Sequence, residues 1–241
     1  MIYQIFHKPE LLDVCDTAST GNRPMAVGPA ALACRQPGIL TDAEGTDQIS
    51  ALNLQLNEWT GIYWLWRHLP ELTDSDAWIG VSHYRRPAPA FMRTDGAIVD
   101  RLLRDYDLLA WIPNISALEQ QAAPANPGLF ATIWTTVEAV FDRPLRERLT
   151  AMSAVPMIHP FSNCFVMTKP RFADYAAWSW RLLEPLVVAA HRAQRVDPAF
   201  ALDAPRNLGF LSERLLPLYC MAHGLKIGFS FTGQYPAHGR D

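Results

Sequence analysis

The segment from Trp78 to Pro87, "WIGVSHYRRP", holds the side chains of this sequence that are best suited to bind a phosphate group. Its first four residues are apolar and predict a short buried strand, which ends in His83, Tyr84, Arg85 and Arg86. Ligands of open α/β sheets bind beyond the carboxyl ends of the strands, and arginine offers a planar fork of donors that matches phosphate oxygens. Adjacent arginines point in different directions, so one is expected to hold a diphosphate while the other anchors the fold. The alternative is a pair of surface arginines in salt bridges worth about 0–1 kcal/mol each.

Two more polar residues stand where chemistry can occur. Asn163 precedes an apolar strand in "HPFSNCFVM", where it either hydrogen-bonds a sugar hydroxyl or satisfies backbone groups at a turn. Glu213 lies early in an amphipathic helix in "RNLGFLSERLL". Its carboxylate is a candidate general base, or else a first-turn glutamate favoured by the helix dipole. The residues alone leave both pairs of alternatives open.

Alternating strands and helices must position these side chains. The clearest pattern predicts a helix over 57–72, with Asn57 as its cap and with Trp59 and Trp66 as core residues rather than a sugar platform. The other predicted helices cover 95–106, about 130–150, 170–192 and 209–224. The predicted strands cover 1–7, 77–82, 107–113, 161–168 and 226–231, and 10–45 and 113–130 are expected to be mainly loops. This alternation predicts an α/β fold with helices on both faces of its sheet.

Composition and charge exclude several classes of protein. The chain has 241 residues and a net charge of −3, so no basic field favours nucleic acid. Its four cysteines are far apart and form no C-x-x-C pair, which indicates reduced thiols. We find neither a signal peptide nor an apolar run near the roughly 20 residues that span a bilayer. We therefore expect a soluble, cytoplasmic protein.

Four motifs resemble a known family. They are "LNEWTGIYWLWRH", "WIGVSHYRRP", "FSNCFVMTKPRFADYAAW" and "GFLSERLL". Their order and approximate spacing are similar to those of the capsular polysaccharide synthesis glycosyltransferase-like family, long catalogued as a domain of unknown function in bacterial surface-polysaccharide clusters. The resemblance begins at "IYQIFHKP", includes "GTDQIS" and covers nearly the whole chain.

The resemblance implies a glycosyltransferase of the GT-A type. The fold would be one Rossmann-like domain over residues 1–241, with a mostly parallel central sheet covered by helices on both faces. Residues 1–112 would bind the nucleotide-sugar, and residues 113–241 would form the acceptor side. The reaction would move a sugar from a nucleoside-diphosphate-sugar to a hydroxyl of a capsule, lipopolysaccharide or exopolysaccharide precursor.

The same resemblance assigns roles to residues. Arg85 and Arg86 would neutralise the leaving diphosphate, and Glu213 would deprotonate the acceptor if the reaction inverts. Glu58 would bind ribose or sugar hydroxyls, unless it only caps its helix. The residues expected to bind the nucleotide-sugar are His7, Lys8, Asp47, Glu58, His83, Tyr84, Asn163 and Arg206.

Metal dependence and localisation follow from what the motifs contain. Many GT-A enzymes carry Asp-x-Asp after a strand, but Asp74–Asp76 precedes its strand and is predicted to be a solvated turn. We therefore expect no resident cofactor or metal besides the nucleotide-sugar co-substrate, with a divalent metal as the alternative. A lipid-linked acceptor would bring the enzyme to the inner face of the membrane. The alternative function is a non-catalytic scaffold module that binds a nucleotide or a glycan.

Overall fold

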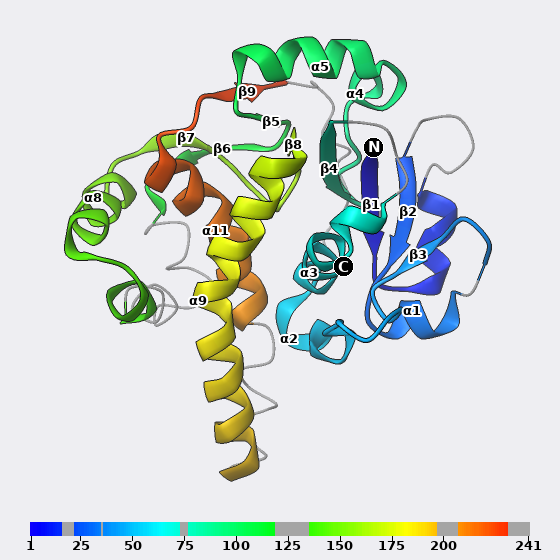
Figure 1. Cartoon of the computed structure of the whole chain (residues 1–241), viewed down its shortest axis with the longest axis horizontal. Helices are drawn as coiled ribbons and strands as arrows, with labels where there is room; N and C mark the ends of the chain where they lie inside the picture. Colours follow the sequence, from blue (N-terminus) through cyan, green and yellow to red (C-terminus); the bar gives the residue numbers. More distant parts are fainter. Residues whose placement is uncertain (16–21, 35, 73–76, 119–134, 197–206, 231–241) are drawn as a thin grey trace.

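A seven-stranded, mostly parallel sheet forms the centre of the protein (Figure 1). Its strand order is β3-β2-β1-β4-β8-β5-β9, and only β8 runs antiparallel to its neighbours β4 and β5. The strands are β1 (Ile2–Phe6), β2 (Asn22–Ala26), β3 (Leu40–Thr41), β4 (Trp78–His83), β5 (Leu108–Ala110), β8 (Phe165–Thr168) and β9 (Ile227–Phe229). The structure, a computed structural model, describes all residues except 16–21, 35, 73–76, 119–134, 197–206 and 231–241.

Helices cover both faces of this sheet. The helices are α1 (Pro29–Ala33), α2 (Asn53–Leu56), α3 (Trp59–Arg67), α4 (Ala90–Thr94), α5 (Gly96–Asp105), α8 (Arg143–Ser153), α9 (Lys169–Val196) and α11 (Asn207–His223), with 3-10 turns η1 (Pro9–Val14), η2 (Ser50–Leu52) and η3 (Leu69–Glu71). Tyr3 and Ile5 of β1 pack in one core with α3, α9 and α11, whereas Ile2 and Phe6 face smaller cores under α4, α5, α1 and η1. This two-residue alternation confirms the predicted α/β fold with a mostly parallel sheet covered on both faces.

Aromatic side chains join the two halves of the larger core. Trp59 of α3 is fully buried, and its ring stacks on Trp180 of α9 with the centroids 6.4 Å apart. Tyr175, one turn earlier on α9, meets the edge of the same indole at 6.3 Å. Trp59 is therefore a core residue, as the helical spacing predicts. Figure 1 shows α9 running past α3 and beyond the sheet.

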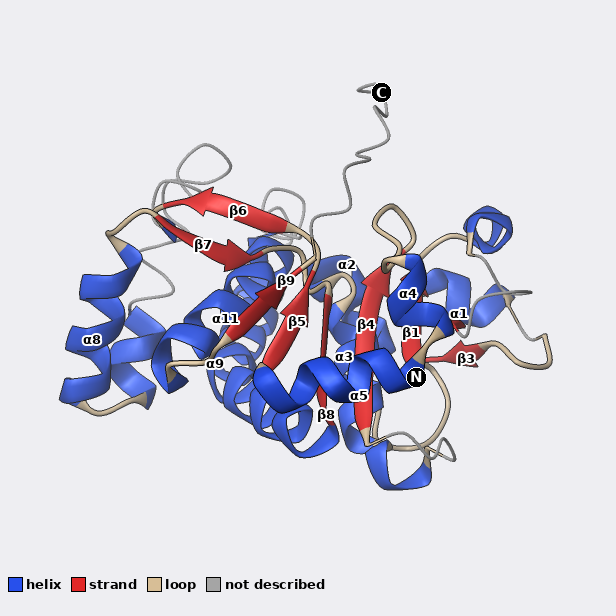
Figure 2. Ribbon diagram, turned by 90° about the horizontal axis from the view of Figure 1, so that it is seen from above, coloured by secondary structure: helices blue, strands red, loops and turns tan. Residues whose placement is uncertain are grey.

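A second, two-stranded sheet lies beside the main one (Figure 2). Strands β6 (Pro113–Ser116) and β7 (Met157–Pro160) pair antiparallel, with Ile115 opposite Ile158. The expectation of a loop from residue 113 onward is wrong for β6, and β7 was not predicted at all. Both strands are short and begin or end in proline, which weakens the sequence pattern of a strand.

The expectation of mainly loop over 10–45 is also wrong. Strands β2 and β3, helix α1 and all but the first residue of the turn η1 lie in this range. Pro24 lies inside β2 and cannot donate a backbone hydrogen bond, but β3 pairs only with Met25 and Ala26, so Pro24 sits beside an unpaired stretch of strand edge. The sequence pattern does not predict β2 because Pro24 interrupts it, and it does not predict β3 because that strand has only two residues.

The sheet topology brings two strand ends together. β1 and β4 are adjacent and parallel, and the register pairs Ile5 with His83. Their carboxyl ends therefore open at the same edge, where the residues after β1 meet those after β4. Helix α3 begins at Trp59, and α11 packs against α2, directly before it. This arrangement positions the residues described next.

Candidate active site

Two carboxyl groups from distant parts of the chain interact. Glu58 directly precedes α3, and Glu213 lies in the second turn of α11. Burial, and after it the negative charge of Glu213, raise the pKa of Glu58 to about 7. Neither group is sealed from solvent, since Glu58 keeps partial exposure and the Glu213 side chain is 20% exposed. A pair of acids with unlike protonation states can serve as a general base and a hydrogen-bond donor.

The alternatives based on helix termini do not apply to these carboxyls. The Glu58 side chain accepts no capping hydrogen bond at the start of α3, and the first turn of α11 holds no acidic residue. The prediction that Asn57 caps α3 is wrong, because the capping position belongs to Glu58. Both glutamates are thus placed by tertiary structure instead of by the helix dipole.

Asn163 holds the Glu58 carboxyl in place. Its Nδ2 donates to Glu58 Oε1 at 3.2 Å, and its Oδ1 accepts from the Tyr175 hydroxyl at 3.0 Å. Asn163 is almost completely buried and has φ of +46°, next to Ser162 at +65°. Asparagine tolerates this left-handed region better than most residues, which explains its use at the sharp turn before β8. The residue orients Glu58, and its contact with a sugar stays a prediction.

Glu213 lies beside a buried arginine. The guanidinium Nη1 of Arg214 is 3.6 Å from Glu213 Oε2 and also donates to the Phe210 carbonyl at 2.6 Å. Burial raises the pKa of Glu213, while the positive charges of Arg214 and Arg86 oppose that rise. The repulsion between the two carboxylates is mutual, but Arg214 stabilises the negative charge of Glu213 alone, so we expect Glu213 to ionise before Glu58.

Arg86 is the cation that serves both carboxyls. It follows β4, and its positive charge lowers the pKa of Glu58 and of Glu213. Its guanidinium lies over the Phe161 ring at 5.0 Å, and its carbonyl accepts from the Trp111 indole at 3.2 Å. The indole contact holds the backbone of Arg86, and the Phe161 ring supports its guanidinium. An arginine held in this way presents charge to a ligand at little cost in side-chain entropy.

The other residues of the motif after β4 form a second group. Arg85 is exposed, and its guanidinium lies over the Tyr84 ring at 5.1 Å, so the two arginines diverge. His7 contributes from the end of β1, with ring centroids 5.4 Å from Tyr84 and 6.5 Å from His83. Burial lowers the pKa of His83 to about 3, and the neighbouring positive charges add to the effect. His83 is therefore neutral, and its Nδ1 accepts from the Arg85 N–H at 3.3 Å.

Asp47 and Lys8 do not join these groups, and the position of Arg206 is not described. Asp47 accepts from Tyr63 at 2.8 Å and pairs with Arg67 at 2.5 Å, along the second half of α3 and away from Glu58 at its start. Lys8 is exposed at the start of η1. Arg206 lies outside the described residues, as do Asp74–Asp76. A nucleotide role for all three stays a prediction.

Asp42 is a buried carboxylate that the sequence pattern did not reveal. It is fully buried after β3, and both its oxygens accept from the Gly28 N–H, at 3.1 and 3.3 Å. Burial raises the pKa of Asp42 to about 6, against hydrogen bonds from Thr60 and Gly28 that lower it. Asp42 thus joins the loop after β2, where Gly28 has φ of +59°, to Thr60 of helix α3. A lone acid after a two-residue strand gives no periodic signal.

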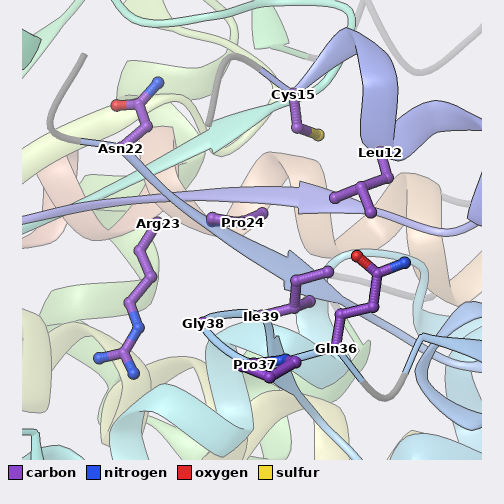
Figure 3. Close-up of a pocket in the computed structure, with 9 residues that line it drawn as sticks. All are labelled: Leu12, Cys15, Asn22, Arg23, Pro24, Gln36, Pro37, Gly38 and Ile39. Carbon is purple, nitrogen blue, oxygen red and sulfur yellow. The ribbon is translucent and has the colours of Figure 1, made fainter. Parts of the chain in front are cut away.

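A pocket of about 560 Å³ lies elsewhere, at the open edge of β2 (Figure 3). It is lined by Leu12, Cys15, Asn22, Arg23, Pro24, Gln36, Pro37, Gly38 and Ile39. Figure 3 shows Asn22 and Arg23 extending away from each other, as neighbours on a strand do. The pocket shares no residue with the carboxyl pair or with the group after β4.

Two properties concern metals and membranes. Within the residues that the structure describes, no three His, Cys, Asp or Glu side chains gather in a way suited to a metal ion. In the same part of the chain, every helix is too short or too polar to span a bilayer. All four cysteines are buried and outside any disulfide.

The raised pKa of Glu58 predicts a dependence of stability on pH. Folding shifts this pKa upward from 4.5, so the native protein binds the proton more tightly and its free energy of unfolding falls as the pH rises from about 4.5 to 7. Glu58→Gln mimics the neutral acid and removes this cost. We expect the variant to be more stable than wild type by about 1–3 kcal/mol at pH 8, and equally stable below pH 4. Urea unfolding at both pH values measures the difference; equal stability at pH 8 would contradict the assigned protonation.

The comparisons with known proteins agree with this architecture. The structure is similar to the apo structure of WbbM, a bifunctional glycosyltransferase, with a TM-score of 0.69 and 20% sequence identity. The match covers 98% of this chain and 47% of that one, so the chain spans about half the length of WbbM. The protein thus has an α/β fold of a kind found in a glycosyltransferase. The family described as Domain of unknown function (DUF4422) matches residues 1–224, and the chain belongs to it. No curated protein matches the sequence.

Proposed function

We propose that this protein is a glycosyltransferase that moves a sugar from a nucleoside-diphosphate-sugar to a hydroxyl of a surface-glycan precursor. The observation that carries the proposal is the carboxyl pair of Glu58 and Glu213 with Arg86 beside it, at the edge of an α/β sheet. Transfer to a hydroxyl requires a base at the acceptor and positive charge at the leaving diphosphate, and this group of residues supplies both. The similarity in fold to WbbM supports the same conclusion.

Each residue has a role in this proposal. Glu213, which ionises first, takes the proton of the attacking hydroxyl. Glu58, still protonated near neutral pH, donates a hydrogen bond to a sugar or ribose hydroxyl while Asn163 fixes its orientation. Arg86 faces the developing charge on the diphosphate, and Arg85 approaches it from the solvent side.

The remaining site residues fit a nucleotide. The rings of His7, His83 and Tyr84 pack together at the ends of β1 and β4; Tyr84 is buried, and His7 and His83 are partly exposed. On this proposal the fold is of the GT-A type, with residues 1–112 holding the donor and residues 113–241 the acceptor. The acceptor is a capsule, lipopolysaccharide or exopolysaccharide precursor, and a lipid-linked one would place the enzyme in the cytoplasm at the inner membrane face.

Donor binding tests the proposal directly. We expect one of UDP, GDP, CMP and dTDP to raise the melting temperature by roughly 5–10 °C at a hundred times its Kd, with or without EDTA. The matching nucleotide-sugar should then support transfer. A rise in melting temperature that requires Mn²⁺ would indicate that a metal ion, and not the arginines, holds the diphosphate. Silence from all four nucleotides and their sugars, with the protein folded, would favour the scaffold function.

A further inference from the structure

The backbone directly before Glu58 has an unusual conformation. Asn57 has φ of +51° and ψ of −132°. A left-handed helix end has ψ near +47°, so this is not an ordinary helix terminus. Residues other than glycine seldom occupy this part of the φ/ψ map, and they do so where the surrounding structure holds them there, often at functional sites. The outlier adjoins one of the two carboxyls, which suggests that it serves that carboxyl.

Three buried hydrogen-bonding groups hold Asn57 in place. Its N–H donates to the Asn53 carbonyl at 2.8 Å. Its own carbonyl accepts from Asn53 Nδ2 at 2.7 Å and from Thr60 Oγ1 at 3.2 Å. Asn53 and Thr60 are both buried, and a fourth hydrogen bond of 3.1 Å joins their side chains. Both polar side chains thus contact one backbone carbonyl, at the residue before Glu58.

The Asn57 side chain then reaches the helix that carries the second carboxyl. A Cβ atom at Gly209 would lie 1.9 Å from Asn57 Nδ2, so only glycine leaves room for this side chain against α11. Gly209 and Glu213 are four residues apart on one helix, which places them on the same side of α11. Asn57 therefore touches α11 one turn before Glu213, while its carbonyl carbon is bonded to the nitrogen of Glu58.

We infer that Asn57 is a positioning residue, which sets the relative placement of Glu58 and Glu213 through its constrained backbone and its contact with Gly209. The inference rests on the proposed function for its effect on catalysis. It does not rest on that function for its effect on the two carboxyls, which can be titrated without any substrate.

Within the residues that the structure describes, charged and titratable groups from several elements surround the pair, and the Cys164 thiol interacts with both carboxyls. Glu58 interacts with Arg86 after β4, with Glu213 of α11, and with the Cys164 thiol and the Tyr175 hydroxyl. Glu213 interacts with Arg86 and Arg214, and His159 of β7 interacts with Arg214. A displacement of Glu58 from Glu213 weakens the repulsion between them and lets in water. Both effects lower the pKa of Glu58 toward its ordinary value.

Four variants test the inference. In Asn57→Ala the residue still carries a Cβ atom, which disfavours this backbone conformation. In Gly209→Ala the added Cβ atom collides with the Asn57 amide. We expect each to lower kcat about 100-fold and to lower the pKa of Glu58. Asn57→Gly accepts the conformation without strain but loses the contact with Gly209, so its kcat should lie between that of Asn57→Ala and that of the wild type. Asn57→Gly combined with Gly209→Ala removes the collision and should raise the kcat of Gly209→Ala to that of Asn57→Gly. Gly96→Ala in α5, where an added Cβ finds only Trp78 at 3.8 Å, is the matched control.

The carboxyl titration is followed by NMR of protein labelled with ¹³C at the glutamate carboxyl, alongside kcat and the melting temperature. Wild-type titration of Glu58 in both Asn57→Ala and Gly209→Ala would overturn the inference. So would equal losses of kcat in Asn57→Gly and Asn57→Ala with unchanged titration, because that result assigns a direct substrate contact to the amide. If Gly209→Ala does not fold, the two Asn57 variants decide. If no donor supports transfer in the wild type, the proposed function fails while the titration still decides the positioning.

Discussion

Replacing Glu213 with glutamine is expected to lower kcat for sugar transfer by about 10²–10⁴-fold, the range that a general base contributes. Glutamine has nearly the same shape but cannot take the acceptor's proton. Glu213 is the carboxyl that ionises first, and it keeps enough exposure for a substrate to reach it. Donor affinity should change little, because the proposal places the diphosphate against Arg86. Steady-state kinetics with the donor identified by thermal shift measures both quantities.

The control for this experiment is Glu71→Gln. Glu71 is an exposed glutamate in η3, outside both site groups, so its variant should keep the wild-type rate. The pH profile adds a second criterion. The kcat of the wild type should rise with pH as Glu213 ionises, and this rise should be absent in Glu213→Gln. A variant that retains the rate and the profile would remove Glu213 from the reaction.

Replacing Arg86 with glutamine should lower kcat by about 10²–10³-fold and should also weaken donor binding. The positive charge of its guanidinium lowers the pKa of both carboxyls. Loss of the guanidinium therefore raises the pKa of both carboxyls further. The remaining activity should still rise with pH, but its midpoint should lie at a higher pH than in the wild type. Calorimetric titration with the nucleotide and a pH–rate profile measure the two effects.

Arg86→Lys separates charge from geometry. Lysine keeps the positive charge but lacks the planar fork of donors. Compared with Arg86→Gln, the Arg86→Lys variant should therefore return the two carboxyl pKa values close to those of the wild type, but it should recover only part of the donor affinity. Arg101→Gln, at an exposed position of α5, is the matched control and should behave as wild type. Unchanged donor affinity in Arg86→Gln would contradict the placement of the diphosphate.

Local patterns predicted the elements that carry the site better than they predicted the residues between them. Helix α3 and strand β4 follow from the spacing of their apolar residues, and Asp95 caps α5 as a helix start of that kind requires. Strand β2 was missed because Pro24 interrupts it, and the conformation of Asn57 was missed because nothing in the sequence specifies a φ angle. That conformation depends on Asn53, Thr60 and Gly209, which act through tertiary structure.

The site itself was predicted as a set of residues but not as an arrangement. Sequence motifs nominated Glu58, Arg86, Asn163 and Glu213 separately, and the structure brings these four together. It leaves Asp47 apart from Glu58, since both its partners lie later on α3. Which motif residues meet depends on the strand order and on the packing of α11 against α2, and neither can be derived from periodicity in one chain.

The long separation in sequence between Glu58 and its partners has a consequence for how the protein becomes competent during synthesis. Asn163, which orients Glu58, lies 105 residues later in the chain, and Glu213 follows later still on α11. During translation the parallel strands β1, β2 and β4 emerge long before either partner. A nascent chain can therefore assemble β1, β2 and β4, but Glu58 does not meet Glu213 until α11 has left the ribosome and docked. Contacts of such high contact order form late in folding, so the carboxyl pair is assembled in one step, at the end.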